Sequence, residues 1–211
     1  IPATHVGGDY YDFFKRDDQT IDLLIADVSG HSVGAALIMA EVRTLLRAQA
    51  NRATSPSVVL NALNTQLYED LSRAELFITM FYARYSASTG KLSYANAGHN
   101  RPLVYRPGEE SCRELDAEGL ILGIKQNVVF EEQSILLQAG DVLFFHTDGI
   151  PEAMTASGEF FGTGRICQHL SVVGLESAEQ IADSFYEQVQ QFSGSETLQD
   201  DISMVVLKIL T

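Results

Sequence analysis

Positive charge is scarce in this chain, and its scarcity limits the kinds of partner it can bind. The 211 residues contain 14 Lys and Arg against 28 Asp and Glu, which gives a formal net charge of −14. Nucleic acids and anionic membranes attract basic surfaces, so neither is an expected partner. A phosphate substrate would also be repelled unless cations lie between it and the protein.

Cysteines and long apolar runs are also few. Cys112 and Cys167 lack the spacing of a zinc or redox motif, so we expect two free thiols and no disulfide. No apolar run approaches the ~18 residues that cross a bilayer, and no signal peptide is recognisable. These absences predict a cytoplasmic protein. Because the first residue is Ile1, we expect an N-terminally truncated fragment of a longer signalling protein.

The pattern of apolar residues favours one α+β domain over residues 1–211. Hydrophobic residues make up 45% of the chain, enough for a substantial core. Strands are predicted at 10–14, 20–28, 77–86, 91–95, 102–105, 128–137, 142–146 and 202–210, helices at 33–51, 56–71 and 178–192, and a loop at 158–164. In the second helix we expect Ser55 as the N-cap and Pro56 as the first helical residue. Strands and helices are segregated along the chain, so we expect two stacked, mostly antiparallel sheets flanked by helices.

Acidic residues stand at the ends of several predicted strands. Asp27 and Asp148 each follow a strongly apolar run, where a carboxylate needs a partner. Carboxylates held on strand ends suit Mg²⁺ and Mn²⁺, and two such ions can activate water for attack on phosphorus. We therefore predict a metal site formed by Asp9, Asp27, Asp148, Asp200 and Asp201. The competing interpretation is that Asp beside Gly marks ordinary turns.

The histidines carry a weaker signal. His99 lies in the turn Asn96–Asn100, where it either caps backbone groups or contributes to a site. His31 follows the turn after Asp27, where it could reach a bound phosphate or donate a proton, or else have a structural role at a helix N-terminus. Ser29 lacks the sequence context of a nucleophilic serine.

Five short motifs in this order resemble a known family. They are Val6-Gly7-Gly8-Asp9, Ala26-Asp27-Val28-Ser29-Gly30-His31, Asn96-Ala97-Gly98-His99-Asn100, Thr147-Asp148-Gly149 and Asp200-Asp201-Ile202-Ser203. Together they are similar to the SpoIIE-type branch of the metal-dependent (PPM, or type 2C) protein phosphatases, over nearly the whole chain. The chain departs from the family at Ser32, where glycine is usual. Ser29 stands where eukaryotic relatives carry a candidate general acid, so that role is unassigned.

The resemblance implies a serine/threonine phosphatase with two Mn²⁺ or Mg²⁺ ions. Asp27 would bridge both ions and Val28 would offer its backbone carbonyl. The remaining metal ligands would be Asp9, Asp148, Asp200 and Asp201, with Asp27 and Asp148 as the catalytic carboxylates. The expected phosphate or substrate contacts are His31, Asn96 and His99.

The resemblance also implies partners. Bacterial members typically act on small phosphorylated regulators, such as antagonists of anti-sigma factors in stress signalling. We therefore expect a substrate of that type, an upstream sensor or receiver domain in the same chain, and a homodimer formed through the helices after Gly30. The alternative is a phosphatase-like adaptor that binds a sigma factor or its regulators with weak or no catalysis. Since every expected acidic position is filled, we favour the enzyme.

Overall fold

The computed structural model describes residues 7–30, 33–50, 53–109, 111–194 and 200–210. The chain divides into two compact units, each with its own antiparallel sheet. Among the described residues, the N-terminal unit comprises those within 7–99 and 116–137, and the C-terminal unit comprises those within 100–115 and 138–210. The described ranges hold two antiparallel sheets and four helices, so the predicted α+β class is confirmed.

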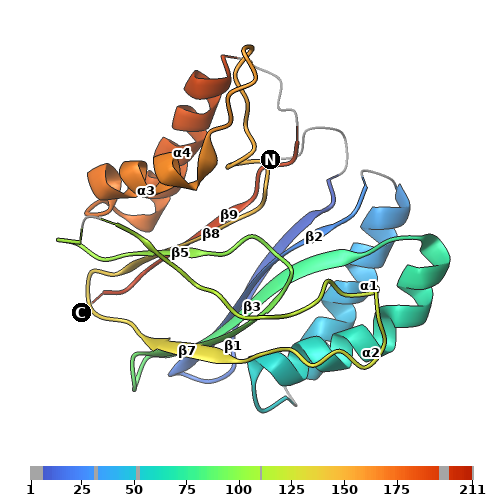
Figure 1. Ribbon diagram of the computed structural model, residues 1–211. Helices are drawn as coiled ribbons and strands as arrows, with labels where there is room; N and C mark the ends of the chain where they lie inside the picture. The colour runs from blue at the N-terminus through green and yellow to red at the C-terminus, as the bar shows by residue number, and fades with distance from the viewer. Residues whose placement is uncertain (1–6, 31–32, 51–52, 110, 195–199, 211) are drawn as a thin grey trace. The chain divides into compact units, whose positions relative to one another are not determined.

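The N-terminal unit is a five-stranded sheet with two helices on one face (Figure 1). Its strands, in spatial order, are β1 (Asp9–Lys15), β2 (Thr20–Val28), β3 (Ile78–Ser86), β4 (Lys91–Ala97) and β7 (Gln133–Leu136). The helices are α1 (Val33–Ala50) and α2 (Pro56–Ala74). Apolar side chains spaced three or four residues apart, such as Val42 and Leu46, face the sheet and are fully buried.

A buried ion cluster fastens the sheet to the connection between α1 and α2. Asp22 on β2 is fully buried and accepts two hydrogen bonds from Arg84 on β3, at 2.7 and 3.0 Å. The hydroxyl of Tyr82 donates a third bond to Asp22, at 2.5 Å. Arg84 also donates to the carbonyl oxygen of Thr54, just before α2. The helix pair is thereby fixed against the end of β2 that lies away from Asp27.

The C-terminal unit is a four-stranded sheet that packs on its own helix pair. The strands, in spatial order, are β6 (Arg113–Glu114), β5 (Leu103–Tyr105), β8 (Val142–His146) and β9 (Met204–Lys208). The helices are α3 (Gly162–Val173) and α4 (Ala178–Ser193). Phe144 of β8 contacts Phe185 of α4 with ring centroids 4.2 Å apart, near the centre of this core.

Helix α3 corrects the predicted loop at residues 158–164. The three glycines there indicate a loop, and Gly162 does have a positive φ of 74°. The helix nevertheless begins at Gly162, because Ile166 and Leu170 are fully buried against the sheet. Two strand boundaries also differ: β4 continues through Ala97 into the motif that was expected to end it, and the predicted strand 128–137 is reduced to β7.

The cysteines are disulfide-bonded, so the prediction of two free thiols is wrong. Cys112 and Cys167 are 55 residues apart in sequence, yet their Cα atoms lie 5.6 Å apart. The fold brings the segment between β5 and β6 against α3, which was not recognised as a helix. Sequence spacing alone therefore gave no indication of the pairing.

Candidate metal-binding site

The N-terminal unit places two of the predicted carboxylates opposite each other. Asp9 is the first residue of β1, and its cross-strand partner on β2 is Asp27. Like charges that face each other across a strand pair repel and destabilise the ladder. A divalent cation bound at this end of the hairpin would offset that repulsion, and both side chains supply the oxygen ligands that hard cations prefer.

Position 8 lies so close to Asp27 and Val28 that any side chain larger than hydrogen would clash with them. An ideal Cβ built on Gly8 would lie 2.4 Å from the carbonyl oxygen of Val28 and 2.9 Å from Oδ1 of Asp27. The backbone is held there by a 3.1 Å hydrogen bond from the Val28 amide to the Gly8 carbonyl. Glycine is therefore required next to the two oxygens that the resemblance implies as metal ligands.

The C-terminal unit carries the other three predicted carboxylates at one end of neighbouring strands. Asp148 follows β8, while Asp200 and Asp201 precede β9, and these strands are antiparallel neighbours. The amide of Thr147 donates to the Ser203 carbonyl at 3.0 Å, and the Ser203 amide donates to Oγ1 of Thr147 at 3.0 Å. These bonds fasten the two acidic segments together at one end of the ladder.

Gly149 allows these two segments to approach closely. A Cβ on Gly149 would lie 2.0 Å from the carbonyl oxygen of Asp201, so only glycine fits. The pKa of Asp148 is raised, first by burial and then by the charges of Asp200 and Asp201. Without a cation, this group of carboxylates therefore favours protonation of Asp148.

Asn96 and His99 hold the turn after β4. The Asn96 side-chain amide donates to the His99 carbonyl at 2.9 Å, and the His99 amide donates back to Oδ1 of Asn96 at 2.8 Å. Nδ1 of His99 lies 2.7 Å from Oγ1 of Thr79, whose cross-strand partner on β2 is Asp27. The backbone capping considered for His99 is thus made by the Asn96 side chain, while the His99 ring contacts Thr79, opposite Asp27 on β2.

Thr79 was missed by the sequence analysis, since only the register of β2 against β3 reveals it. The predicted contact His31 lies outside the described residues. Within the described ranges, no group of three or more His, Cys, Asp or Glu side chains is arranged to hold a metal ion. Each unit, taken by itself, therefore carries only some of the predicted oxygen ligands.

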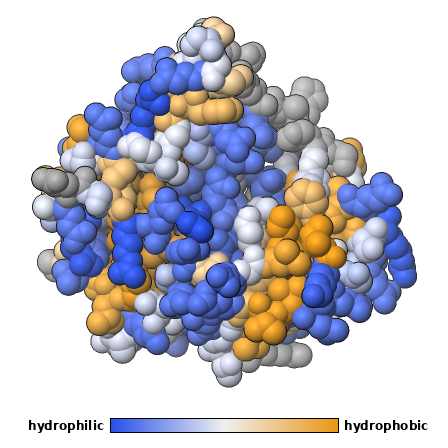
Figure 2. Space-filling model, in the orientation of Figure 1, coloured by the Kyte–Doolittle hydropathy of each residue, from blue (hydrophilic) through white to orange (hydrophobic). Residues whose placement is uncertain are grey.

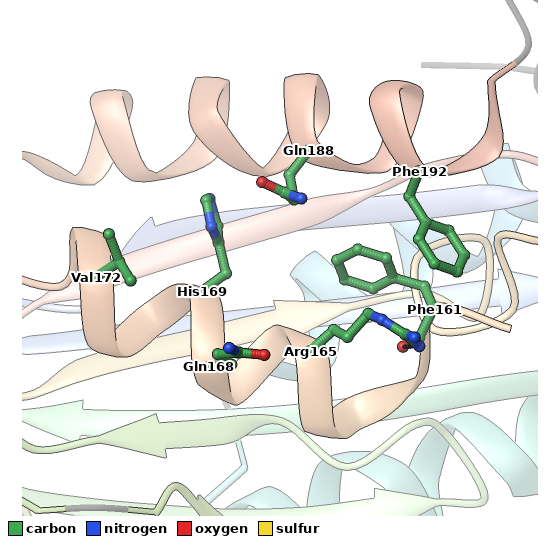
Figure 3. Close-up of a pocket in the computed structure, with 7 residues that line it drawn as sticks. All are labelled: Phe161, Arg165, Gln168, His169, Val172, Gln188 and Phe192. Atoms are coloured by element: carbon green, nitrogen blue, oxygen red, sulfur yellow. Dashed lines mark hydrogen bonds between the residues drawn. The ribbon is translucent and has the colours of Figure 1, made fainter.

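One cavity lies outside these acidic positions, between α3 and α4 (Figure 3). Its volume is about 300 Å³, and its lining consists of Phe161, Arg165, Gln168, His169, Val172, Gln188 and Phe192. Arg165 stacks on the Phe192 ring at 4.8 Å and also pairs with Glu159. The arginine is thus engaged within the protein, and none of the predicted site residues lines this cavity.

Solved structures share the fold of this chain. The SiaA-PP2C domain of Pseudomonas aeruginosa superimposes with a TM-score of 0.85 at 20% identity, covering 99% of this chain and 83% of that one. RsbX in complex with magnesium gives a TM-score of 0.69 at 18% identity, over 95% and 86% of the two chains. At these identities the likeness establishes the fold, which is that of the PP2C-type phosphatases.

The family follows from the sequence comparisons. A family model described as Stage II sporulation protein E (SpoIIE) matches residues 17–210, and the chain therefore belongs to this family. Among curated proteins, phosphoserine phosphatase RsbU of Bacillus subtilis (strain 168) is 31% identical over 208 residues. That alignment covers 99% of this chain but 61% of RsbU, so the chain spans less than two thirds of this relative.

No helix in the described part of the chain is long and apolar enough to cross a membrane.

Proposed function

We propose that this protein is a Mn²⁺- or Mg²⁺-dependent phosphatase that removes phosphate from serine or threonine of a small regulatory protein. The observation that carries the proposal is the opposition of Asp9 and Asp27 at the end of the β1–β2 hairpin, with Gly8 against Oδ1 of Asp27. Membership of the SpoIIE family and the 31% identity to a phosphoserine phosphatase support the same activity.

The residues fit a divalent cation by their chemistry. The proposed ligands are oxygens throughout, from Asp9, Asp27, Asp148, Asp200, Asp201 and the carbonyl of Val28. Bound cations would neutralise phosphate charge and lower the pKa of water for attack on phosphorus. The pKa of Asp148 is raised first by burial and then by its acidic neighbours, and this supports the fit, because both effects are offset by a positive neighbour.

The chain's own groups have separate tasks in this proposal. Gly8 and Gly149 have no side chain, so the backbone can pass close to the acidic strand ends without a clash. Thr147 and Ser203 fix the segments that carry Asp148 and Asp201. The substrate that we propose is a phosphoserine-bearing regulator of the anti-sigma antagonist type. The net charge of −14 means that such a substrate would approach most readily once cations have reduced the repulsion.

Hydrolysis of p-nitrophenyl phosphate tests the activity. We expect turnover with Mn²⁺, none with EDTA, and loss of at least about a hundredfold in kcat for Asp27→Asn, as expected for removal of a metal ligand. Asp18→Asn is the matched control, because Asp18 is an exposed carboxylate in the β1–β2 turn. Equal turnover in EDTA and Mn²⁺, or an Asp27→Asn variant as active as the control, would overturn the proposal.

The adaptor remains the second candidate. A chain that binds its regulator but turns over neither p-nitrophenyl phosphate nor a phosphoserine peptide with Mn²⁺ would favour it. The filled acidic positions favour the enzyme, since an adaptor has no need to keep repelling carboxylates opposite each other.

A further inference from the structure

The segment between β6 and β7 exposes apolar side chains. Leu120 is 40% exposed, Ile124 53% and Val129 86%. Figure 2 shows hydrophobic side chains gathered over this part of the face seen in Figure 1. We name Leu120, Ile124 and Val129 the apolar strip. Leu120 and Val129 line a cavity of about 610 Å³ together with Glu118, Lys125 and Glu131.

This segment is firmly attached to the N-terminal unit. Leu122, which lies between Leu120 and Ile124, and Phe130, which follows Val129, are buried in the core of that unit. The Gly123 amide donates to Oδ1 of Asn64 at 3.0 Å, and the Asn64 side chain donates to the Lys125 carbonyl at 2.9 Å. The strip therefore projects from an ordered backbone, which lowers the entropic cost of binding a partner.

The strip also begins close to the acidic end of the sheet. Ile78, at the start of β3, pairs with Val28 of β2 on one side and with Leu122 on the other. Two steps between neighbouring strands amount to about 10 Å. A protein that covered the strip would therefore lie beside the strand end that carries Asp27.

The charges around the strip indicate what kind of partner it fits. Glu118 and Glu131 line the cavity, and Lys125 is the one cationic side chain in the lining. The pKa of Glu131 is lowered, chiefly by a hydrogen bond from the Glu118 amide, so this carboxylate is charged at neutral pH. Apolar side chains within an acidic rim are complementary to apolar side chains flanked by Lys or Arg.

We infer that the apolar strip is the docking surface for the phosphoprotein substrate, and that it takes a segment of apolar residues flanked by basic ones. This inference rests on the proposed phosphatase function. Docking next to Asp27 would hold the phosphoserine near the proposed metal ligands. The strip would therefore select protein substrates over free phosphate esters.

Binding is the first test, because it does not depend on turnover. The probe is a fluorescein-labelled synthetic peptide in which pairs of Leu alternate with pairs of Lys. The readout is fluorescence anisotropy. We expect Ile124→Ser/Val129→Ser to weaken binding at least about tenfold, through the loss of two apolar contacts. Val172→Ser/Leu175→Ser is the matched control, since those side chains are 75% and 80% exposed. Equal binding by the two double variants would overturn the inference.

Kinetics with two phosphoserine peptides separate this inference from the proposed function. One peptide carries the Leu–Lys flank, and the other carries a Gly–Ser flank of equal length. We expect wild type to prefer the first about tenfold in kcat/KM, and Ile124→Ser/Val129→Ser to reduce that ratio to about one. Turnover without any preference would overturn the docking surface alone. Failure to hydrolyse either peptide or p-nitrophenyl phosphate would overturn the phosphatase, and the binding experiment would still decide about the strip.

Discussion

Replacing Gly8 by alanine adds a single methyl group at the most crowded point of the N-terminal acidic site. That carbon would lie 2.4 Å from the Val28 carbonyl oxygen and 2.9 Å from Oδ1 of Asp27, so the β1 or β2 end must move. Overpacking of this kind costs about 1–3 kcal/mol of stability. Displacing groups that orient metal ligands typically lowers metal affinity 10- to 100-fold, and we expect Gly8→Ala to weaken Mn²⁺ binding by about that factor.

The assay combines urea unfolding with calorimetric Mn²⁺ titration. Gly164→Ala is the matched control, because Gly164 lies in α3 and a Cβ there meets no atom within 4 Å. We expect that control to be stabilised by up to about 1 kcal/mol, since alanine favours helices, and to bind Mn²⁺ normally. A Gly8→Ala protein with wild-type stability and Mn²⁺ affinity would refute the reasoning.

Three further predictions concern other parts of the molecule. Asp148→Asn should raise the Tm of the protein in EDTA at pH 7. The pKa of Asp148 is raised in the native state, so ionisation of this carboxyl lowers stability as pH rises through that pKa, and asparagine removes this cost. A lower Tm for the variant would contradict this reasoning. Reducing the Cys112–Cys167 disulfide, which closes a 55-residue separation, should lower the free energy of unfolding by about 4 kcal/mol, as measured by urea unfolding with and without dithiothreitol; equal midpoints would count against a disulfide in solution. Asp22→Asn should cost about 3–5 kcal/mol of unfolding free energy, because it removes the fully buried charge partner of Arg84, whose own side chain is 14% exposed, while Mn²⁺ affinity stays near wild type. A change in unfolding free energy below about 1 kcal/mol would show that the cluster contributes little.

The parts of the fold with strong local signals were predictable. Strand β8 is a continuous apolar run from Val142 to Phe145 followed by His146, and the prediction matches its bounds. Pro56 was expected to open α2 as its first residue, and it does. Helix α3 was missed as a whole, because Gly158, Gly162 and Gly164 indicate a loop, while burial of Ile166 and Leu170 favours a helix. Tertiary packing outweighed local propensity there.

The candidate site was predictable as a set of residue types but not as an arrangement. An aspartate at the end of an apolar strand is visible in the sequence, so Asp27 and Asp148 were identified. The opposition of Asp9 and Asp27 depends on hairpin register, and the link from His99 to Thr79 depends on how β3 pairs with β2. Those relations, like the disulfide, connect distant positions that no local pattern determines.

Calorimetric titration of the protein with Mn²⁺ tests the central claim most directly. We predict saturable binding of two ions per chain, reduced to one or none in Asp27→Asn and unchanged in the Asp18→Asn control. Competition by Mg²⁺ is expected, because every proposed ligand is an oxygen. The absence of Mn²⁺ binding by wild type, or an unchanged isotherm for Asp27→Asn, would contradict the account.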